Sequence, residues 1–464
     1  MNSPYLNQKD ITVDSSATIC ALATAQGGAL GIIRISGPAT ISIVCSVCNN
    51  IAPSTPPNSI RYANIIDTNG EVIDEVLVSI FHAPHSYTGE DSAEISCHGS
   101  RYILNKVLEL LLKRGCRMAN PGEYTMRAYL NGKMDLSQAE AVADLIASTN
   151  QTTHHIAMSQ LRGGISTELS KLREKLLKLT SLLELELDFS DHEELEFADR
   201  TELLELAKTI KSHISHLEDT FETGQAIKQG IPVAIIGKTN VGKSTLLNQL
   251  LHDERAIVSD IHGTTRDTIE DTIDIHNVTF RFIDTAGIRN THDKIEKIGI
   301  ERTFQTIKKA RIILWLIDSL PTTEEIDEIT SLCNNKKLII IQNKIDKKES
   351  SSYTLPPTLS PVIRLSAKEG YGMDTLEQAI YQSSDIPEIN DGDVIITSLR
   401  HYEALTLAQT NIDQVIDGLE TQLSSDLIAE DLHAVLTHLG EITGGEITTN
   451  EVLGNIFQHF CVGK

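Results

Sequence analysis

Between residues 231 and 383, short apolar runs alternate with segments of helical spacing. The runs are strand-sized and read PVAIIG, TFRFIDT, RIILWLID, KLIIIQNK and PVIRLSA. Continuous apolar runs of this length are typical of strands that are buried on both faces. Their alternation with helices is typical of a doubly wound, mostly parallel sheet. The pattern therefore predicts an α/β domain in this part of the chain.

Residues 16–133 combine two kinds of pattern. Runs rich in β-forming residues lie at 31–35, 72–81 and 93–97, and one helical pattern lies at 102–114. This mixture predicts a small α+β domain at the beginning of the chain.

The remaining chain is helical in pattern. Leucines recur at helical spacing between residue 135 and about residue 222, and Gly224 is a plausible end of this stretch. The leucines with the clearest spacing are Leu169, Leu172, Leu176, Leu179 and Leu183. After Pro387 the helical spacing returns and continues to Leu439. We expect the two stretches to pack together, with the α/β domain inserted between them.

These patterns predict a multidomain protein. The expected order is an α+β domain at 1–133, the first part of a discontinuous helical domain at 134–227, an inserted α/β domain at 228–385, and the second helical part at 386–464. A chain of 464 residues is too long for one compact core, which agrees with several domains.

Composition narrows the cellular setting. Among the 464 residues, 40 are Lys or Arg and 64 are Asp or Glu, which gives a formal net charge of −24. Such a chain is repelled by nucleic acid and by anionic membranes at long range, so any RNA contact needs a local patch or a more basic partner. The apolar runs are too short to cross a bilayer, and the first residues lack the plan of a signal peptide. With seven cysteines, an odd number, we expect reduced thiols in the cytoplasm.

One motif predicts a phosphate-binding loop. Residues 237–244 read GKTNVGKS and lie between a predicted strand and a predicted helix. The glycines allow backbone N–H groups to surround a phosphate, and the start of the helix adds its positive end. Lys243 is expected to reach the β- and γ-phosphates, and Ser244 to offer its hydroxyl to Mg²⁺.

Four further motifs follow in the order that a GTPase of the Ras-like class requires. Residues 263–267 (GTTRD) suit a switch loop in which Thr265 completes the Mg²⁺ shell. Residues 284–287 (DTAG) suit a second switch, with Asp284 holding Mg²⁺ through water and the Gly287 N–H on the γ-phosphate. Residues 343–346 (NKID) supply the carboxylate of Asp346, which can accept two hydrogen bonds from guanine but finds no such donor pair on adenine. Residues 366–368 (SAK) offer a backbone N–H to the guanine oxygen.

Together these motifs predict a GTP-binding site and its metal. The expected GTP-binding residues are Asn240, Val241, Gly242, Lys243, Ser244, Thr245, Ser259, Asp260, Ile261, His262, Gly263, Thr264, Thr265, Asp284, Thr285, Ala286, Gly287, Asn343, Lys344, Ile345, Asp346, Ser366, Ala367 and Lys368.

The residue after the second switch motif is Ile288, at the position where many regulatory GTPases place a glutamine that orients the attacking water. Another group must therefore orient the water, and Glu296 is the best candidate in the same segment. On sequence pattern alone, a solvated carboxylate on a helix is the favoured explanation of Glu296.

Several strings outside the nucleotide motifs carry a family resemblance. They are GIIRISGP at 31–38, SYTGEDSAEISCHGS at 86–100, NPGEYTMRAYLNGKMDLSQAEAVADLI at 120–146, DTAGIRNTHDKIEKIGIER at 284–302 and the terminal FCVGK. With them, the chain resembles the MnmE (TrmE) family of tRNA-modification GTPases over nearly its full length. It departs from the common family pattern at Lys238-Thr239, where Arg-Pro is frequent, and in the loop at 25–28, which lacks a frequent arginine.

The resemblance implies an activity and partners. It implies a homodimer whose N-terminal domain dimerises and binds a tetrahydrofolate derivative, in the 5,10-methylene or 5-formyl form. It also implies a complex with a flavoprotein resembling MnmG, which carries the FAD, and with tRNA but no membrane. That complex adds an aminomethyl or carboxymethylaminomethyl group to the wobble uridine of certain tRNAs, and the folate supplies the one-carbon unit.

The resemblance also implies residue roles. Folate-contacting positions of the family fall on Arg34, Glu94, Lys133 and Lys464, and Cys461 lies in the terminal motif. A potassium ion is expected beside the phosphates on Asn240, Ser259, Ile261 and Thr264. Glu296 falls on the proposed catalytic carboxylate, so the expected catalytic residues are Glu296, Lys243 and Thr265.

Two other functions stay open at this point. The first is a ribosome-assembly GTPase, an RNA-binding switch that shares the GTT-R switch and the apolar residue after the second switch motif. Such proteins usually carry a basic RNA-binding appendage, whereas the segments flanking the motifs here are helical and acidic. The second is a scaffold in which the GTP site only orders a complex.

Overall fold

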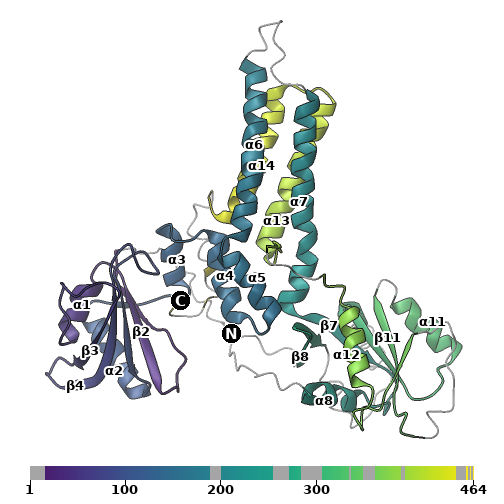
Figure 1. Ribbon diagram of the computed structural model, residues 1–464, viewed down its shortest axis with the longest axis horizontal. Helices are drawn as coiled ribbons and strands as arrows, with labels where there is room; N and C mark the ends of the chain where they lie inside the picture. The colour runs from purple at the N-terminus through teal and green to yellow at the C-terminus, as the bar shows by residue number, and fades with distance from the viewer. Residues whose placement is uncertain are drawn as a thin grey trace, which may run out of the picture. The chain divides into compact units, whose positions relative to one another are not determined.

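The computed structural model describes residues 16–188, 200–253, 271–283, 306–333, 336–347, 361–387, 392–445, 456–457, 460 and 463. The chain divides into two compact units (Figure 1). The first unit comprises Met1–Ala147, Ala157–Ile214 and Glu403–Lys464, and the second comprises Ser148–Ile156 and Ser215–Tyr402.

The first unit begins with a six-stranded sheet in the order β3-β4-β5-β2-β1-β6. Its strands are β1 (Ile19–Leu22), β2 (Leu30–Ser36), β3 (Ser59–Ile66), β4 (Val72–Phe81), β5 (Ser92–His98) and β6 (Arg117–Met118). Its helices are α1 (Thr40–Val47), α2 (Arg101–Lys113) and α3 (Glu123–Leu130). The three strand runs and the helix predicted from the sequence are confirmed in β2, β4, β5 and α2.

Alternation of residue types builds this sheet. In β4, Val76, Val78 and Ile80 are buried, whereas Glu75 and Leu77, on the alternate positions, are exposed. The buried side chains join one core with α1 and α2, which places these two helices against one face of the sheet. Successive residues of a strand point to opposite faces. The other face therefore carries the residues between the buried ones.

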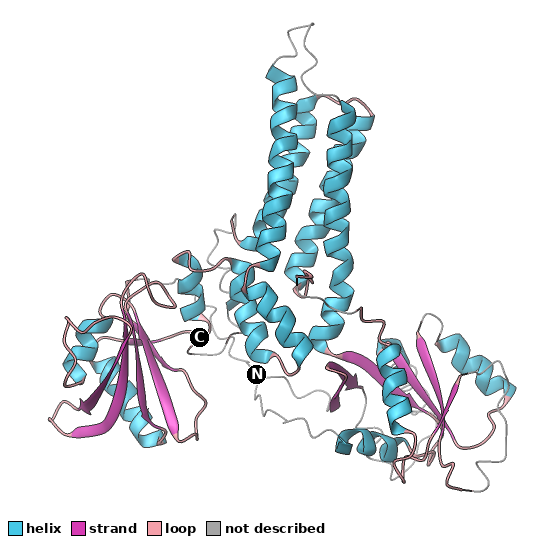
Figure 2. Ribbon diagram, viewed as in Figure 1, coloured by secondary structure: helices cyan, strands magenta, loops and turns pink. Residues whose placement is uncertain are grey.

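The helical part of the first unit is built from long helices, which Figure 2 shows in cyan. They are α4 (Leu136–Ala147), α6 (Gly164–Asp188) and α14 (Ser425–Thr443), together with parts of α5 (Gln151–Leu161), α7 (Arg200–Gln229) and α13 (Leu399–Glu420), whose other residues belong to the second unit. The five leucines with helical spacing lie in α6, and all five are buried. Helix α14 packs along α6.

Ion pairs connect the two helical stretches within this unit. Lys208 of α7 contacts Glu420 of α13 at 2.9 Å, and Lys211 contacts Asp413 at 2.6 Å. The prediction that the two helical stretches pack together is therefore confirmed.

The prediction that Gly224 ends a helix is wrong. Helix α7 continues past it to Gln229. A Cβ at Gly224 would lie only 2.0 Å from the carbonyl oxygen of Ile396, so the segment that follows the α/β sheet crosses the helix directly at this glycine. The glycine is explained by close packing rather than by a helix terminus.

The second unit contains a six-stranded sheet in the order β12-β11-β10-β7-β9-β8. Its strands are β7 (Ile231–Ile236), β8 (Asp271–Ile275), β9 (Val278–Phe282), β10 (Ile312–Ile317), β11 (Lys337–Gln342) and β12 (Val362–Arg364). Its helices are α8 (Lys243–Asp253), α11 (Thr323–Leu332) and α12 (Met373–Gln382). All five predicted strands are present. The sixth, β8, was not predicted, and it is the one strand that pairs antiparallel.

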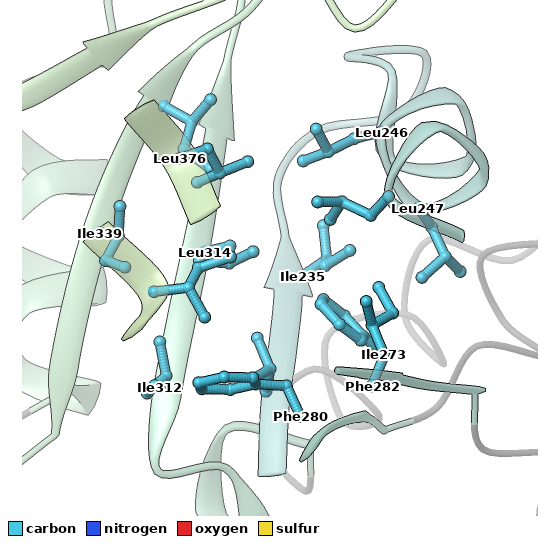
Figure 3. Close-up of a cluster of buried hydrophobic side chains, with 14 of the residues drawn as sticks. Ile235, Leu246, Leu247, Ile273, Phe280, Phe282, Ile312, Leu314, Ile339 and Leu376 are labelled. Carbon is cyan, nitrogen blue, oxygen red and sulfur yellow. The ribbon is translucent and has the colours of Figure 1, made fainter. Parts of the chain in front are cut away.

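Helices cover both faces of this sheet. On one face, Leu246 and Leu247 of α8 and Leu376 of α12 pack against Ile235 and Leu314 (Figure 3). On the other face, strand residues including Ile236 and Trp315 pack with apolar residues of α11. Burial on both faces explains why the sequences of the central strands β7 and β10 and of β11 are mostly apolar.

No helix in the described ranges is long and apolar enough to cross a membrane.

Candidate nucleotide-binding site

The loop between β7 and α8 can form only because two of its residues are glycines. Gly237 has φ +146° and Gly242 has φ +105°, values that favour glycine. A Cβ at Gly237 would lie 2.4 Å from the Leu316 carbonyl oxygen, and one at Gly242 would lie 2.3 Å from Asn343 Nδ2. Between them, Asn240 is also left-handed, at φ +63°. The loop is therefore held close to the neighbouring β10 and β11 segments.

Lys243, the first residue of α8, lies across this loop. Its Nζ donates to the carbonyl oxygens of Gly237 at 2.6 Å and of Lys238 at 2.8 Å. Burial lowers the pKa of Lys243, because the charged ammonium loses contact with water. The positive charge is thus positioned at the N-terminus of α8, where an anion would also meet the helix dipole.

Asn343 joins this loop to a second loop after β12. Its side chain is almost fully buried, with 2% of the residue exposed. Nδ2 donates to the Val241 carbonyl oxygen at 2.8 Å, and Oδ1 accepts from the Ala367 N–H at 3.0 Å. One amide therefore fixes the distance between the predicted phosphate loop and the predicted base-binding loop.

Lys344 adds a third connection. Its Nζ donates to the Asn240 carbonyl oxygen at 2.6 Å and forms an ion pair with Asp318 at 2.7 Å. Asp318 follows β10 directly, so the loops after β7, β10, β11 and β12 meet at the carboxyl edge of the parallel sheet. Ligands of open α/β sheets bind at this edge.

Asp346 is exposed at the same edge. Its Oδ1 accepts from the Ser366 hydroxyl at 2.7 Å. This hydrogen bond lowers the pKa of Asp346, because it stabilises the ionised carboxylate. The group is therefore a charged acceptor at neutral pH.

The loop at 366–368 offers fewer free donors than its sequence suggests. The Ser366 N–H donates to the Tyr371 carbonyl oxygen at 3.0 Å, and the Ala367 N–H donates to Asn343. Among the three, only the Lys368 N–H has no acceptor within the described part of the chain. It is the donor that remains for a ligand oxygen.

The other predicted nucleotide residues fall into two groups. Val241 is buried in the loop, Ser244 and Thr245 are in the first turn of α8, and Ile345 follows Lys344. Those that lie outside the described residues are Ser259, Asp260, Ile261, His262, Gly263, Thr264, Thr265, Asp284, Thr285, Ala286, Gly287 and Glu296.

A second cluster of predicted site residues lies on the sheet of the first unit. Arg34 of β2 and Glu94 of β5 are direct cross-strand partners. Arg34 Nε donates to Glu94 Oε1 at 2.9 Å, and an Arg34 terminal nitrogen lies 2.8 Å from the same oxygen. A further nitrogen of Arg34 donates to the Gly463 carbonyl oxygen at 3.1 Å, which brings the end of the chain to this pair.

Two tyrosines that the sequence reading did not single out complete the cluster. The Arg34 guanidinium lies 5.7 Å from the ring centre of Tyr87 and 5.6 Å from that of Tyr124. The Tyr124 hydroxyl also donates to the Arg34 carbonyl oxygen at 2.8 Å. Both rings are within reach of a cation–π contact. Tyr87 lies in the segment 86–100 and Tyr124 in the segment 120–146, both of which carry the family resemblance. Their position in these segments is the sequence feature that could have identified them.

Lys133 is connected to the cluster through a loop. Its Nζ donates to the Pro84 carbonyl oxygen at 2.9 Å, and Pro84 and Tyr87 belong to the same connection between β4 and β5. Gly463, at φ +98°, passes so close to β1 that a Cβ would lie 2.5 Å from the Leu22 carbonyl oxygen. The structure thus brings together Arg34, Glu94 and Gly463. The predicted Lys464 and Cys461 lie outside the described residues.

A buried charge network supports this end of the sheet. Arg127 of α3 donates to both carboxylate oxygens of Glu90 at 3.0 Å and to Glu123. Burial raises the pKa of Glu123, but hydrogen bonds from Arg117 and from the Asn120 N–H outweigh it, so the pKa of Glu123 is lowered overall. The carboxylate is therefore held in its ionised form inside the protein.

The fold and the geometry of the sheet edge together define a P-loop GTPase of the Ras-like class. Two family models match the chain: "GTP-binding protein TrmE N-terminus" over residues 18–133 and "MnmE helical domain" over residues 136–461.

Curated relatives match nearly the whole chain. The tRNA modification GTPase MnmE of Bacteroides thetaiotaomicron is 54% identical and that of Phocaeicola vulgatus 53% identical, each over 96% of this chain and 99% of the relative. That of Flavobacterium johnsoniae is 49% identical over the same shares. The chain belongs to the MnmE family.

Proposed function

We propose that this chain is a potassium-stimulated GTPase of tRNA modification. Together with a flavoprotein resembling MnmG, it adds a (carboxymethyl)aminomethyl group to the wobble uridine of certain tRNAs and uses a one-carbon unit from tetrahydrofolate. The observation that carries the GTPase part is the Asn343 amide, which joins the loop around Lys243 to the loop around Ser366. The family membership of the chain supports the tRNA part.

The donors and acceptors of the sheet edge fit a magnesium nucleotide. Lys243 already binds two carbonyl oxygens and can exchange them for the more negative oxygens of the β- and γ-phosphates. Ser244 in the first turn of α8 would hold Mg²⁺, with Thr265 and Asp284 expected from the sequence. Mg²⁺ would neutralise charge on the phosphates, while the backbone of the loop orients them.

Guanine selection falls to Asp346. Ser366 occupies one lone pair of Oδ1 and keeps the carboxylate ionised. The rest of the exposed carboxylate can accept from the N1–H and the amino group of guanine. Lys368 offers its N–H to the guanine oxygen on the other side of the base. Adenine presents neither the donor pair nor that oxygen.

Hydrolysis needs two further groups, which we assign from the sequence. Glu296 orients the attacking water in place of the usual glutamine. A potassium ion bound by Asn240, Ser259, Ile261 and Thr264 neutralises charge that develops between the phosphates. Hydrolysis should then be faster in K⁺ than in Na⁺ at equal ionic strength, and Asn240→Ala should remove the difference.

The Arg34 cluster fits a folate. A folate carries carboxylates and a pterin rich in hydrogen-bond donors. Arg34, Lys133 and Lys464 can bind the former and Glu94 the latter. The exposed ring of Tyr87 gives a flat surface beside them, whereas Tyr124 is buried and contacts Arg34 from inside the protein. The folate would be the 5,10-methylene or 5-formyl form. FAD stays on the partner, and the enzyme works as a homodimer in the cytoplasm.

Mass spectrometry of tRNA from cells that lack this chain tests the proposal. We expect wobble uridines without the added group, restored by the wild-type gene but not by Asp346→Asn. Unchanged uridines together with accumulated ribosome precursors would favour a ribosome-assembly GTPase instead. Full restoration by Asp346→Asn would favour a scaffold whose GTP site is not needed for chemistry.

A further inference from the structure

A cavity of about 240 Å³ lies beside the phosphate loop, on the α11 side of the second sheet. Its apolar wall is formed by Ile236, Val241, Trp315, Ile317, Pro321 and Ile329. Several of these residues stand at the carboxyl ends of β7 and β10, the edge where open α/β sheets bind ligands. Gly237, Lys238 and Val241 of the phosphate loop also line this cavity, and no ligand proposed above occupies it.

Three carboxylates line the cavity, and they differ in their partners. Asp318 is paired with Lys344 at 2.7 Å, and Glu325 is paired with Lys238 at 2.6 Å. The side chain of Glu328, one turn after Glu325 in α11, is exposed and forms no ion pair or hydrogen bond with any residue of the described ranges. Glu328 is therefore the one of these three carboxylates without a paired cation in the described ranges, since Lys238 pairs with Glu325 and Lys344, from outside the lining, pairs with Asp318.

The size of the cavity limits what it can hold. Sites for drug-sized ligands measure roughly 300–1,000 Å³, so this one suits an occupant about as large as an amino-acid side chain. The apolar wall, which includes Trp315, favours a hydrocarbon stem, and the carboxylate of Glu328 favours a cation at the end of that stem. A guanidinium group combines a planar charge with weak hydration, and it pairs with carboxylates through a fork of N–H groups.

We propose that this cavity binds a guanidinium group carried on a short apolar stem, with the stem against the Trp315 wall and the cation at Glu328. The occupant lies next to Lys238, so it reaches the loop that holds the phosphates without entering the phosphate site. A free alkylguanidine and an arginine side chain of another polypeptide share this chemistry.

The chain contains its own reporter for this site. Trp315 is the single tryptophan among the 464 residues, and it lies in the wall of the cavity. The full-length protein is titrated with n-butylguanidinium chloride at constant ionic strength while tryptophan emission is recorded. We expect a saturable change in emission, and no saturable change with n-butanol at the same concentrations.

Matched variants locate the binding. Glu328→Gln keeps the shape of the side chain but removes its charge, and it should weaken n-butylguanidinium binding about two- to fivefold, the range of an exposed ion pair. Glu324→Gln, on the same helix but outside the cavity lining, should leave binding unchanged. Ile329→Phe narrows the cavity and should abolish the emission change, while circular dichroism reports whether the variant is folded.

A second titration with the peptide acetyl-Gly-Arg-Gly-amide separates the two sources of the cation. A response to both probes points to an arginine of a partner protein, and a response to n-butylguanidinium alone points to a free small molecule. The proposal fails if n-butylguanidinium gives no saturable change, if n-butanol binds equally well, or if Glu324→Gln weakens binding as much as Glu328→Gln.

Discussion

Helices α1 and α2 lie against one face of the first sheet, whereas helices cover both faces of the second. The first sheet can therefore present Arg34 and Glu94 from the middle of neighbouring strands, on the face opposite α1 and α2. The second sheet has no free face, and its functional residues gather in the loops at its carboxyl edge. The way a sheet is covered thus decides whether a ligand is met by strand residues or by loops.

The two sites also differ in how they are made rigid. The first is supported by a network of charged side chains. In it, Arg127 of α3 pairs with Glu123 of the same helix and with Glu90 in the connection between β4 and β5. The second is supported by glycines and one amide, because backbone segments approach each other too closely for side chains. A buried charge network should be sensitive to pH, and a packed backbone should be sensitive to added volume.

The largest expected effect is on the stability of the first unit. Glu123→Gln removes the buried carboxylate that Arg117 and Arg127 share, so that Arg127 keeps only Glu90 among its carboxylate partners in the described ranges. It should lower the free energy of unfolding at pH 7 by about 3 kcal/mol. Amide hydrogen exchange in α3 and β2 measures this change. Glu71→Gln, an exposed carboxylate of the same unit, should change protection little.

The stabilisation by Glu123 should depend on pH, and the direction of its pKa shift determines where the stabilisation is lost. The folded-state pKa of Glu123 lies below its ordinary value of 4.5. Its stabilisation is therefore present above pH 4.5 and is lost as the pH falls through the lowered value. Wild type and Glu123→Gln should converge in stability on acidification. A difference that stays constant down to the acid limit would show that the ionised carboxylate is not the cause.

The next effect is on the second site. Gly242→Ala places a Cβ 2.3 Å from Asn343 Nδ2 at a backbone angle of +105°. The loop must move, and GTP affinity should fall by roughly 100-fold or more, about 3 kcal/mol, which is the upper range for overpacking. Gly392→Ala is the matched control, since Gly392 has φ +111° in the same unit but open space around its Cβ position. Equal GTP affinities for the two variants would contradict the packed-loop explanation.

A smaller effect is expected at the guanine end. Asp346→Asn replaces a carboxylate acceptor by an amide, and GTP affinity should fall on the order of 30-fold from the loss of charge-assisted hydrogen bonds. Xanthosine triphosphate, which has a carbonyl in place of the amino group, should bind the variant better than GTP does. Asp374→Asn, on the exposed first turn of α12, serves as the control. A variant that prefers GTP as strongly as the wild type would refute the assignment.

Most of this fold could be predicted from the sequence, and the strands of the second sheet show why. Strands β7, β10 and β11 of the second sheet were predicted because burial on both faces makes them mostly apolar, and β9 and β12 because β-forming residues dominate their short runs. Strand β8 was missed because this edge strand, Asp271–Ile275, alternates polar and apolar residues and gives only a short signal. Gly224 was misread because its reason is the carbonyl of Ile396, far away in sequence. Local patterns contain no information on such an approach.

The sequence predicted which residues form the two sites, but it did not predict the contacts between these residues. Asn343 was predicted as part of a base-reading motif. In the structure, both the nitrogen and the oxygen of its side-chain amide form hydrogen bonds within the protein. Tyr87 and Tyr124 were overlooked because aromatic residues have no spacing rule that marks a contact with Arg34. Hydrogen bonds between distant segments decide which donors remain free, and the sequence does not show them.

Calorimetry with two ligands tests the central claim that one chain carries two separate sites. Wild type, Gly242→Ala and Arg34→Ala are each titrated with GTP and with 5-formyltetrahydrofolate, and Arg61→Ala, an exposed arginine of β3, serves as the control for Arg34. We expect Gly242→Ala to lose GTP binding and keep the folate. Arg34→Ala should bind the folate about tenfold more weakly, as expected for one lost charge-assisted contact, and should keep GTP. Undiminished folate binding by Arg34→Ala, or loss of both ligands in either folded variant, would contradict two independent sites.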